Sequence, residues 1–280
     1  MISNASIAVM IGGIALICVM VICLMLYYKF KYHTKITTFL IGAATFILFA
    51  LVLEQLMHVL VLFKSPVGDT IQNNIWLYAL YGGLAAGVFE ETGRLIAMKF
   101  LLKKEHRKPH TALMYGAGHG GIEALLLGGL SLLSNLIYSF MINAGQEQML
   151  LSQIPAEQLE TVQESFKQLK EASPALFAAI PAERVSAVTL HIALSVLVWT
   201  AVVKKKPTMY MLAILLHFLL DAVAVLLKDK IPIAALELLL FVISVLTALL
   251  AYAVWKKHLA GGQQEAVPEG TAIQVPPTDS

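Results

Sequence analysis

The chain has 280 residues, of which 58% are hydrophobic and 14% are charged, and its formal net charge is +2. Soluble domains have about 45–50% apolar and about 25% charged residues, so this composition excludes an ordinary soluble domain. A net charge this small gives no reason to expect nucleic acid binding.

Long apolar stretches recur along almost the whole chain. A helix needs about 20 apolar residues to cross a bilayer, and seven stretches reach that length. We therefore expect an all-α, polytopic membrane bundle over residues 1–260, in the cell membrane. The predicted spans, in chain order, are Ile7–Tyr28, Ile36–Phe63, Ile75–Leu102, Thr111–Ile142, Arg184–Val203, Met209–Leu227 and Ile231–Trp255.

The basic residues predict the orientation. Twelve lysines and arginines fall in one set of alternate connections and five in the other. Cytoplasmic loops carry the excess of basic residues, which predicts an outside N-terminus and a cytoplasmic C-terminus.

Two segments lie outside the predicted spans. Residues 143–183 form an outer loop in which Leu159, Val162, Phe166 and Leu169 repeat at helical spacing. This pattern predicts an amphipathic surface helix bounded by Pro155 and Pro174, acting as a cap or as a substrate gate. Residues 261–280 are rich in Gly, Pro and Gln, which predicts a disordered cytoplasmic tail.

Ionisable residues inside four of the spans are the strongest functional signal, because charge at membrane depth is costly and usually serves a site. At about 1.5 Å per residue, they fall at one level, roughly 12–20 Å from the cytoplasmic helix ends. The residues are Glu90, Glu91 and Arg94 in the third span, His119 and Glu123 in the fourth, His191 in the fifth, and His217 and Asp221 in the sixth.

Spacing predicts several contacts in this cluster. His119 and Glu123, like His217 and Asp221, are four residues apart and share a helix face. Arg94 follows both glutamates by a turn, so its guanidinium is expected to lie between the two carboxylates.

Glycines predict how the helices approach. Gly83 and Gly87, with Gly116 and Gly120, favour close packing of the third span on the fourth. Glu54, His58 and Glu237 lie nearer the outer surface, where we expect structural pairing with Arg184. Ser195, beside His191, is expected to bond to its own helix backbone rather than act as a nucleophile.

Four motifs in order resemble a known family. They are Glu90-Glu91-Thr92-Gly93-Arg94, Gly118-His119-Gly120-Gly121-x-Glu123, Glu183-Arg184 with His191, and His217-xxx-Asp221. Together they resemble the YhfC-like intramembrane metalloproteases, in the wider superfamily of CAAX-type endopeptidases and bacteriocin-processing proteases. Arg94 lies one position closer to the glutamates than in CAAX-type enzymes, and Tyr115 replaces a phenylalanine. The resemblance therefore implies hydrolysis more directly than CAAX processing.

The resemblance implies an intramembrane endopeptidase acting on a membrane-associated peptide or protein. Peptide hydrolysis needs a base, an oxyanion stabiliser and a proton donor. Glu90 would be the base, His119 would hold the water, Arg94 and Glu91 would set its charge, and His217 with Asp221 would stabilise the oxyanion or donate the proton.

A metal-dependent version stays open beside the metal-free one. In it, His119 and His217, with His191 or Glu123, would hold a zinc ion (Zn²⁺).

Two other functions also fit a buried polar cluster. A proton- or cation-coupled transporter or channel could use the Glu/His/Asp groups as a relay. A non-catalytic receptor or partner subunit could use them for packing alone. The sequence does not indicate an oligomeric state.

Overall fold

The computed structural model describes residues 1–260, and these form an all-helical membrane bundle. The predicted tail, 261–280, lies outside the described residues. Six helices in the described part are long and apolar enough to cross a membrane. They are α1 (Asn4–Tyr32), the helix from α2 (Ile36–Phe46) through η1 (Ile47–Glu54), α3 (Gln55–His58) and η2 (Val59–Phe63), the helix from α6 (Thr111–Glu123) through η5 (Ala124–Gly129) to α7 (Leu130–Asn143), α10 (Pro174–Val203), α11 (Pro207–Leu227) and α12 (Ile233–His258).

A further long helix carries charge into the bundle. It consists of α5 (Ile75–Ile96) and η3 (Ala97–Leu101), and it follows the short α4 (Gly68–Gln72). Glu90, Glu91 and Arg94 are all buried in it, and Lys99 lies near its end. Because of these charges it is less apolar than the six helices above. The count of seven spans and their orientation stay predictions.

The fifth predicted span begins earlier in the structure than in the sequence analysis. α10 starts at Pro174, not at Arg184, and Ser173 before it is extended. Proline fits the first turn of a helix, where its missing N–H would have no partner, so Pro174 starts a helix. The outer segment therefore contains α8 (Glu147–Leu151) and α9 (Ala156–Glu171), and Phe166 and Leu169 are the buried residues of α9.

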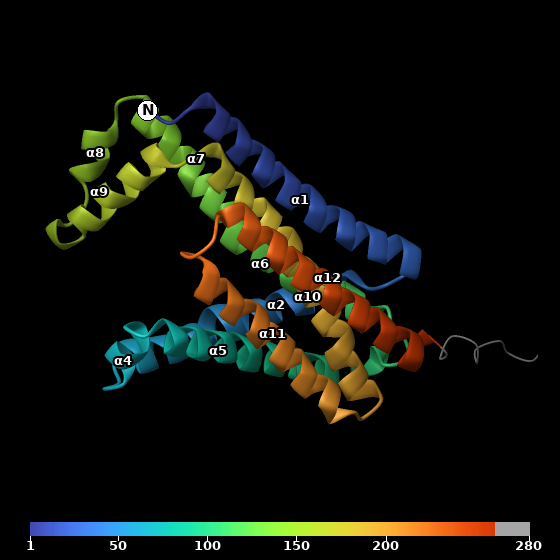
Figure 1. Ribbon diagram of the computed structural model, residues 1–280. Coiled ribbons are helices and arrows are strands. Elements are labelled where there is room, and N and C mark those ends of the chain that lie inside the picture. The colour runs from blue at the N-terminus through green and yellow to red at the C-terminus, as the bar shows by residue number, and fades with distance from the viewer. Residues whose placement is uncertain (261–280) are drawn as a thin grey trace, which may run out of the picture.

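α10 is the most buried helix of the bundle. It packs against α1, α6, α11 and α12, while α5 packs mainly on α11 and α2 packs mainly on α6. Figure 1 shows α1 and α12 following a similar diagonal course, with α5 and α11 below them. The short η4 (Lys103–Glu105) connects η3 to α6. α10 thus contacts the helices that carry every part of the predicted site.

Glycines allow this packing, but with partners other than those predicted. A Cβ on Gly83 or Gly87 would lie 2.8 Å or 2.9 Å from backbone oxygens of α11. A Cβ on Gly116 would lie 2.6 Å from the Cα of Ile192 in α10, and one on Gly118 would lie 2.0 Å from the carbonyl oxygen of Phe39 in α2. The prediction that these glycines pack the third span closely on the fourth is therefore wrong. The glycines instead bring α5 to α11, and α6 to both α10 and α2.

Replacing Gly118 by alanine should destabilise the bundle, because the added methyl group would overlap the backbone of α2. Overpacking of this kind costs about 1–3 kcal/mol. Thermal unfolding of the purified protein in detergent measures the effect. Gly12→Ala is the matched control, because no atom lies within 4 Å of its Cβ position. Equal unfolding temperatures for the two variants would contradict the packing described.

Candidate active site

Four helices bring the predicted residues into one cluster. Glu90, Glu91 and Arg94 come from α5, His119 and Glu123 from α6, His191 from α10, and His217 and Asp221 from α11. All are buried except Asp221, whose side chain is 33% exposed. The cluster therefore has one carboxylate that is more accessible than the rest.

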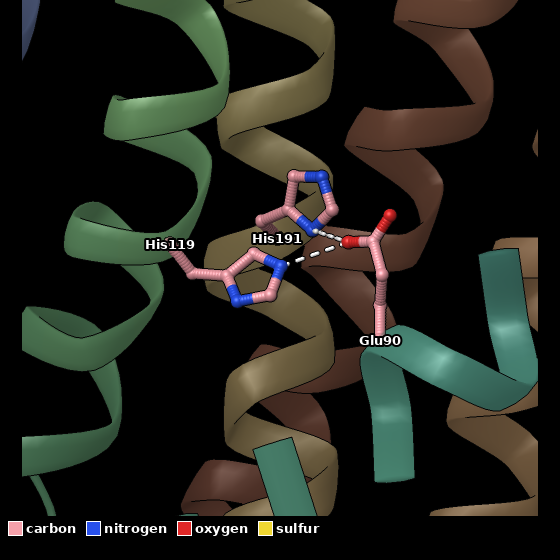
Figure 2. Close-up of side chains that lie close together, drawn as sticks. All are labelled: Glu90, His119 and His191. Carbon is pink, nitrogen blue, oxygen red and sulfur yellow. Dashed lines mark hydrogen bonds and ion pairs between the residues drawn. The ribbon is translucent and has the colours of Figure 1, made fainter. Parts of the chain in front are cut away.

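Glu90 lies at the centre of three histidines. Its Oε2 atom is 2.8 Å from His119 Nε2 and 4.0 Å from His191 Nδ1, as Figure 2 shows. Its Oε1 atom is 4.0 Å from His217 Nε2. The two oxygens of this carboxylate thus face different histidines.

One chain of ionic contacts fixes His217. Arg94 Nε lies 3.2 Å from Glu91 Oε2, and both side chains are fully buried. Glu91 Oε1 lies 2.9 Å from His217 Nδ1. Since Glu91 faces a guanidinium, it accepts a hydrogen bond from Nδ1, which leaves His217 Nε2 directed toward Glu90.

A second chain of the same kind fixes His191. Arg184 Nη1 lies 2.7 Å from Glu123 Oε1, and Glu123 Oε2 is in direct contact with His191 Nε2. Arg184 Nη2 also pairs with Glu183, at 2.6 Å. Nδ1 of His191 is thereby turned toward Glu90. Carboxylates that orient histidines in this way are typical of metal and acid–base sites.

Arg94 also ties α5 to α10. Its Nη1 atom donates to the carbonyl oxygen of His191 at 2.7 Å and to Ser195 Oγ at 2.9 Å. Its Nη2 atom lies 3.0 Å from His191 Nδ1. Ser195 donates to the His191 carbonyl at 2.7 Å, so its hydroxyl bonds to its own helix, as expected from the sequence.

Two predicted contacts differ in the structure, and a third is present. Arg94 pairs with Glu91 alone, because its remaining donors are taken up by α10. Glu123 contacts His191 and Arg184, not its helix neighbour His119. The predicted pair of His217 with Asp221 is present, at 3.6 Å from Nε2, and His217 also makes a hydrogen bond to Glu91 through Nδ1.

Arg184 belongs to the cluster, although the sequence predicts it in an outer structural layer. The signal in the sequence was the Glu183-Arg184 motif on the same span as His191. In the structure Gly128 leaves room for this arginine, because a Cβ there would lie 2.6 Å from Arg184 Cγ. The outer residues do not pair with Arg184 by hydrogen bonds. Glu54 lies 3.2 Å from His58, which lies 2.9 Å from the hydroxyl of Tyr81.

A cavity of about 220 Å³ gives access to the cluster. Its polar lining includes Glu90, His191, His217 and Asp221, and its apolar lining includes Leu220. Glu91 is fully buried and does not line this cavity. Glu90 is therefore the α5 carboxylate that a substrate can approach.

The donor atoms fit a divalent metal ion in type and in charge. Glu90, His119 and His191 each offer one atom within 4.8 Å of the others. Tetrahedral ligands around zinc lie about 3.4 Å apart, a value bracketed by the distances around Glu90 Oε2. The cluster has two more carboxylates than guanidiniums, so a cation would offset its negative charge. For His191 to be a ligand, its Nδ1 contact with Arg94 has to open.

The model of the YhfC intramembrane metalloprotease family matches residues 14–258. The chain belongs to this family. It is 39% identical over 228 residues to a Bacillus subtilis (strain 168) protein described as the uncharacterized membrane protein YhfC, and the match covers 80% of this chain and 86% of that protein. No solved structure matches the chain. Membership fits the multi-pass membrane fold described above.

Arg94→Gln should destabilise the protein strongly, because it leaves Glu91 as a buried charge without its partner. Breaking a buried ion pair from one side costs about 3–5 kcal/mol. Lys170→Gln is the control: it breaks a partly exposed pair with Glu147, which is worth about 1 kcal/mol or less. Unfolding in detergent measures both, and similar losses would contradict the role given to Arg94.

Proposed function

We propose that the chain is an intramembrane endopeptidase that hydrolyses a peptide bond of a membrane-associated protein or peptide. The observation that carries this proposal is Glu90, a buried carboxylate between three histidines and beside a cavity. Family membership supports it, since the family is described as an intramembrane metalloprotease family.

Glu90 is the best candidate for the general base. Its Oε1 atom faces His217 Nε2 and Glu90 lines the cavity, so a water molecule there can reach both groups. Glu91 is unsuited to this role, because Arg94 and His217 occupy its two oxygens. General bases of this kind contribute about 10²–10⁴-fold to the rate.

The reaction can be written from these groups. Glu90 accepts a proton from water, and the water oxygen forms a bond to the peptide carbonyl carbon. The carbon–nitrogen bond then breaks, and the leaving amine takes up the proton that Glu90 accepted. His217, held by Glu91 and near Asp221, is positioned to stabilise the negatively charged oxygen of the intermediate.

Glu90, His119 and His191 are the residues that would hold a divalent ion such as Zn²⁺. A bound ion would supply a water molecule of lowered pKa and would polarise the substrate carbonyl. The Glu123 carboxylate on His191 would orient that imidazole for the ion. Glu90 would offer one carboxylate oxygen to the ion and keep the other, which faces His217, to accept the proton from water.

We also propose the superfamily relationship and the membrane orientation that the sequence indicates. The glutamate pair on α5 and the histidines on α6 and α11 support a place in the superfamily of CAAX-type and bacteriocin-processing proteases. The basic residues at the C-terminal ends of α1 and α12 support a cytoplasmic C-terminus. Substrates would then meet the cluster within the bilayer.

Glu90→Gln should lower the rate of cleavage by about 10²–10⁴-fold, because an amide accepts no proton at neutral pH. His119→Ala and His217→Ala should lose activity as well. The measurement is cleavage of a library of membrane-anchored peptides by purified protein, read by mass spectrometry. Glu105→Gln is the control, since it makes the same chemical change in η4, outside the cluster. Full activity of Glu90→Gln would exclude Glu90 as the base.

A chelator should stop cleavage, and added Zn²⁺ should restore it, if the metal-dependent version holds. Metal content measured by mass spectrometry gives a readout that is independent of activity. Wild type should retain bound metal, whereas His119→Ala should lose it. Cleavage that is insensitive to chelator, in protein without bound metal, would exclude the metal and leave the Glu90 mechanism in place.

A further inference from the structure

A second cavity, separate from the active site, lies between α1, α6, α10 and α12. Its volume is about 420 Å³, within the range of about 300–1,000 Å³ typical of small-molecule sites. Half of its lining residues are aliphatic, as suits a site for a hydrocarbon chain. The aliphatic residues are Leu113, Ile192, Ala193, Val196, Ala248 and Ala251.

Aromatic side chains form one end of this cavity. Tyr28 and Tyr32 come from α1, and Tyr252 and Trp255 come from α12. His110 stacks on Tyr32, with ring centres 3.9 Å apart, and lies 5.1 Å from the ring of Trp255. Tyrosine and tryptophan concentrate at the membrane interface, so this end lies at the level of the lipid headgroups.

Lysines lie on the aromatic end from both sides. Lys31 Nζ is 5.5 Å from the centre of the Tyr32 ring, and Lys256 Nζ is 5.0 Å from that of Tyr252. α1 and α12 end on the same side of the bundle, as Figure 1 shows, and further basic residues occupy their last turns. Lys31 also donates to the hydroxyl of Tyr27 at 2.6 Å. Two positive charges thus lie beside aromatic rings that line this end of the cavity.

Few acidic residues offset the positive charge of these lysines. In the described connections at this end of the bundle, Glu105 is the acidic residue, and it pairs with Lys35 and Lys108. The hydrogen bond from Lys35 lowers the pKa of the Glu105 carboxyl, so it stays ionised and engaged with those lysines. The mouth of the cavity therefore favours an anion.

We propose that this cavity is a binding site for an anionic phospholipid. An acyl chain lies along the aliphatic lining between α10 and α12, and the phosphate lies against Lys31 and Lys256. Basic pockets between membrane helices bind anionic headgroups in this way. The inference uses no residue of the proposed active site and is independent of hydrolysis.

Native mass spectrometry of the full chain in detergent tests the proposal, with phosphatidylglycerol and phosphatidylcholine as probes. Phosphatidylglycerol should bind more tightly. The double variant K31Q/K256Q should weaken its binding by roughly thirtyfold, since each lysine contributes about fivefold toward an anionic headgroup. K103Q/K104Q removes the same charge from η4, at the same end of the bundle, and should change binding less than twofold.

Two further arms separate the cavity from general electrostatic attraction. A248F fills the apolar part and should weaken the binding of both lipids without lowering the unfolding temperature. Glycerol phosphate, which has no acyl chain, should not compete. The proposal is overturned if the two lipids bind equally or if K103Q/K104Q acts as strongly as K31Q/K256Q. It is also overturned if A248F has no effect, if glycerol phosphate displaces the lipid, or if a second copy of the chain occupies this face.

Discussion

The structure depends on two buried arginine–glutamate pairs, each of which holds a histidine. Arg94 pairs with Glu91, which binds His217, and Arg184 pairs with Glu123, which contacts His191. Buried charge is tolerated only when it is paired and hydrogen-bonded. Each pair neutralises one carboxylate, so Glu90 and Asp221 are the acidic groups of the cluster left without a guanidinium.

The helix packing follows from the same requirement. The Arg184–Glu123 pair joins α10 to α6, and Arg94 on α5 donates to α10, so these contacts form only if the backbones approach closely. Gly116 allows α6 to approach α10, Gly128 leaves room for the stem of Arg184, and Gly87 lets α11 lie against α5. The positions of small residues and the positions of charges in this sequence thus serve one arrangement.

Much of this arrangement could be predicted from sequence. Apolar length gives the membrane helices, and the depth of the charged residues places Glu90, His119 and His217 at one level. Pairing across helices could not be derived, because spacing along one helix predicts only neighbours on that helix. For this reason His119 and Glu123 were expected to face each other, whereas Glu123 contacts α10. The sequence around Pro174 could not show whether this proline ends one helix or starts the next, since proline is common at both places.

Family membership and the cluster together leave one decisive question, whether the charges perform chemistry or conduct ions. Wild type and Glu90→Gln, reconstituted in vesicles, can be assayed in parallel for cleavage of a membrane-anchored peptide and for proton flux. Our account predicts that wild type cleaves the peptide, that Glu90→Gln does not, and that neither moves protons. A wild type that cleaves nothing but conducts protons through a path requiring Glu90 would contradict it.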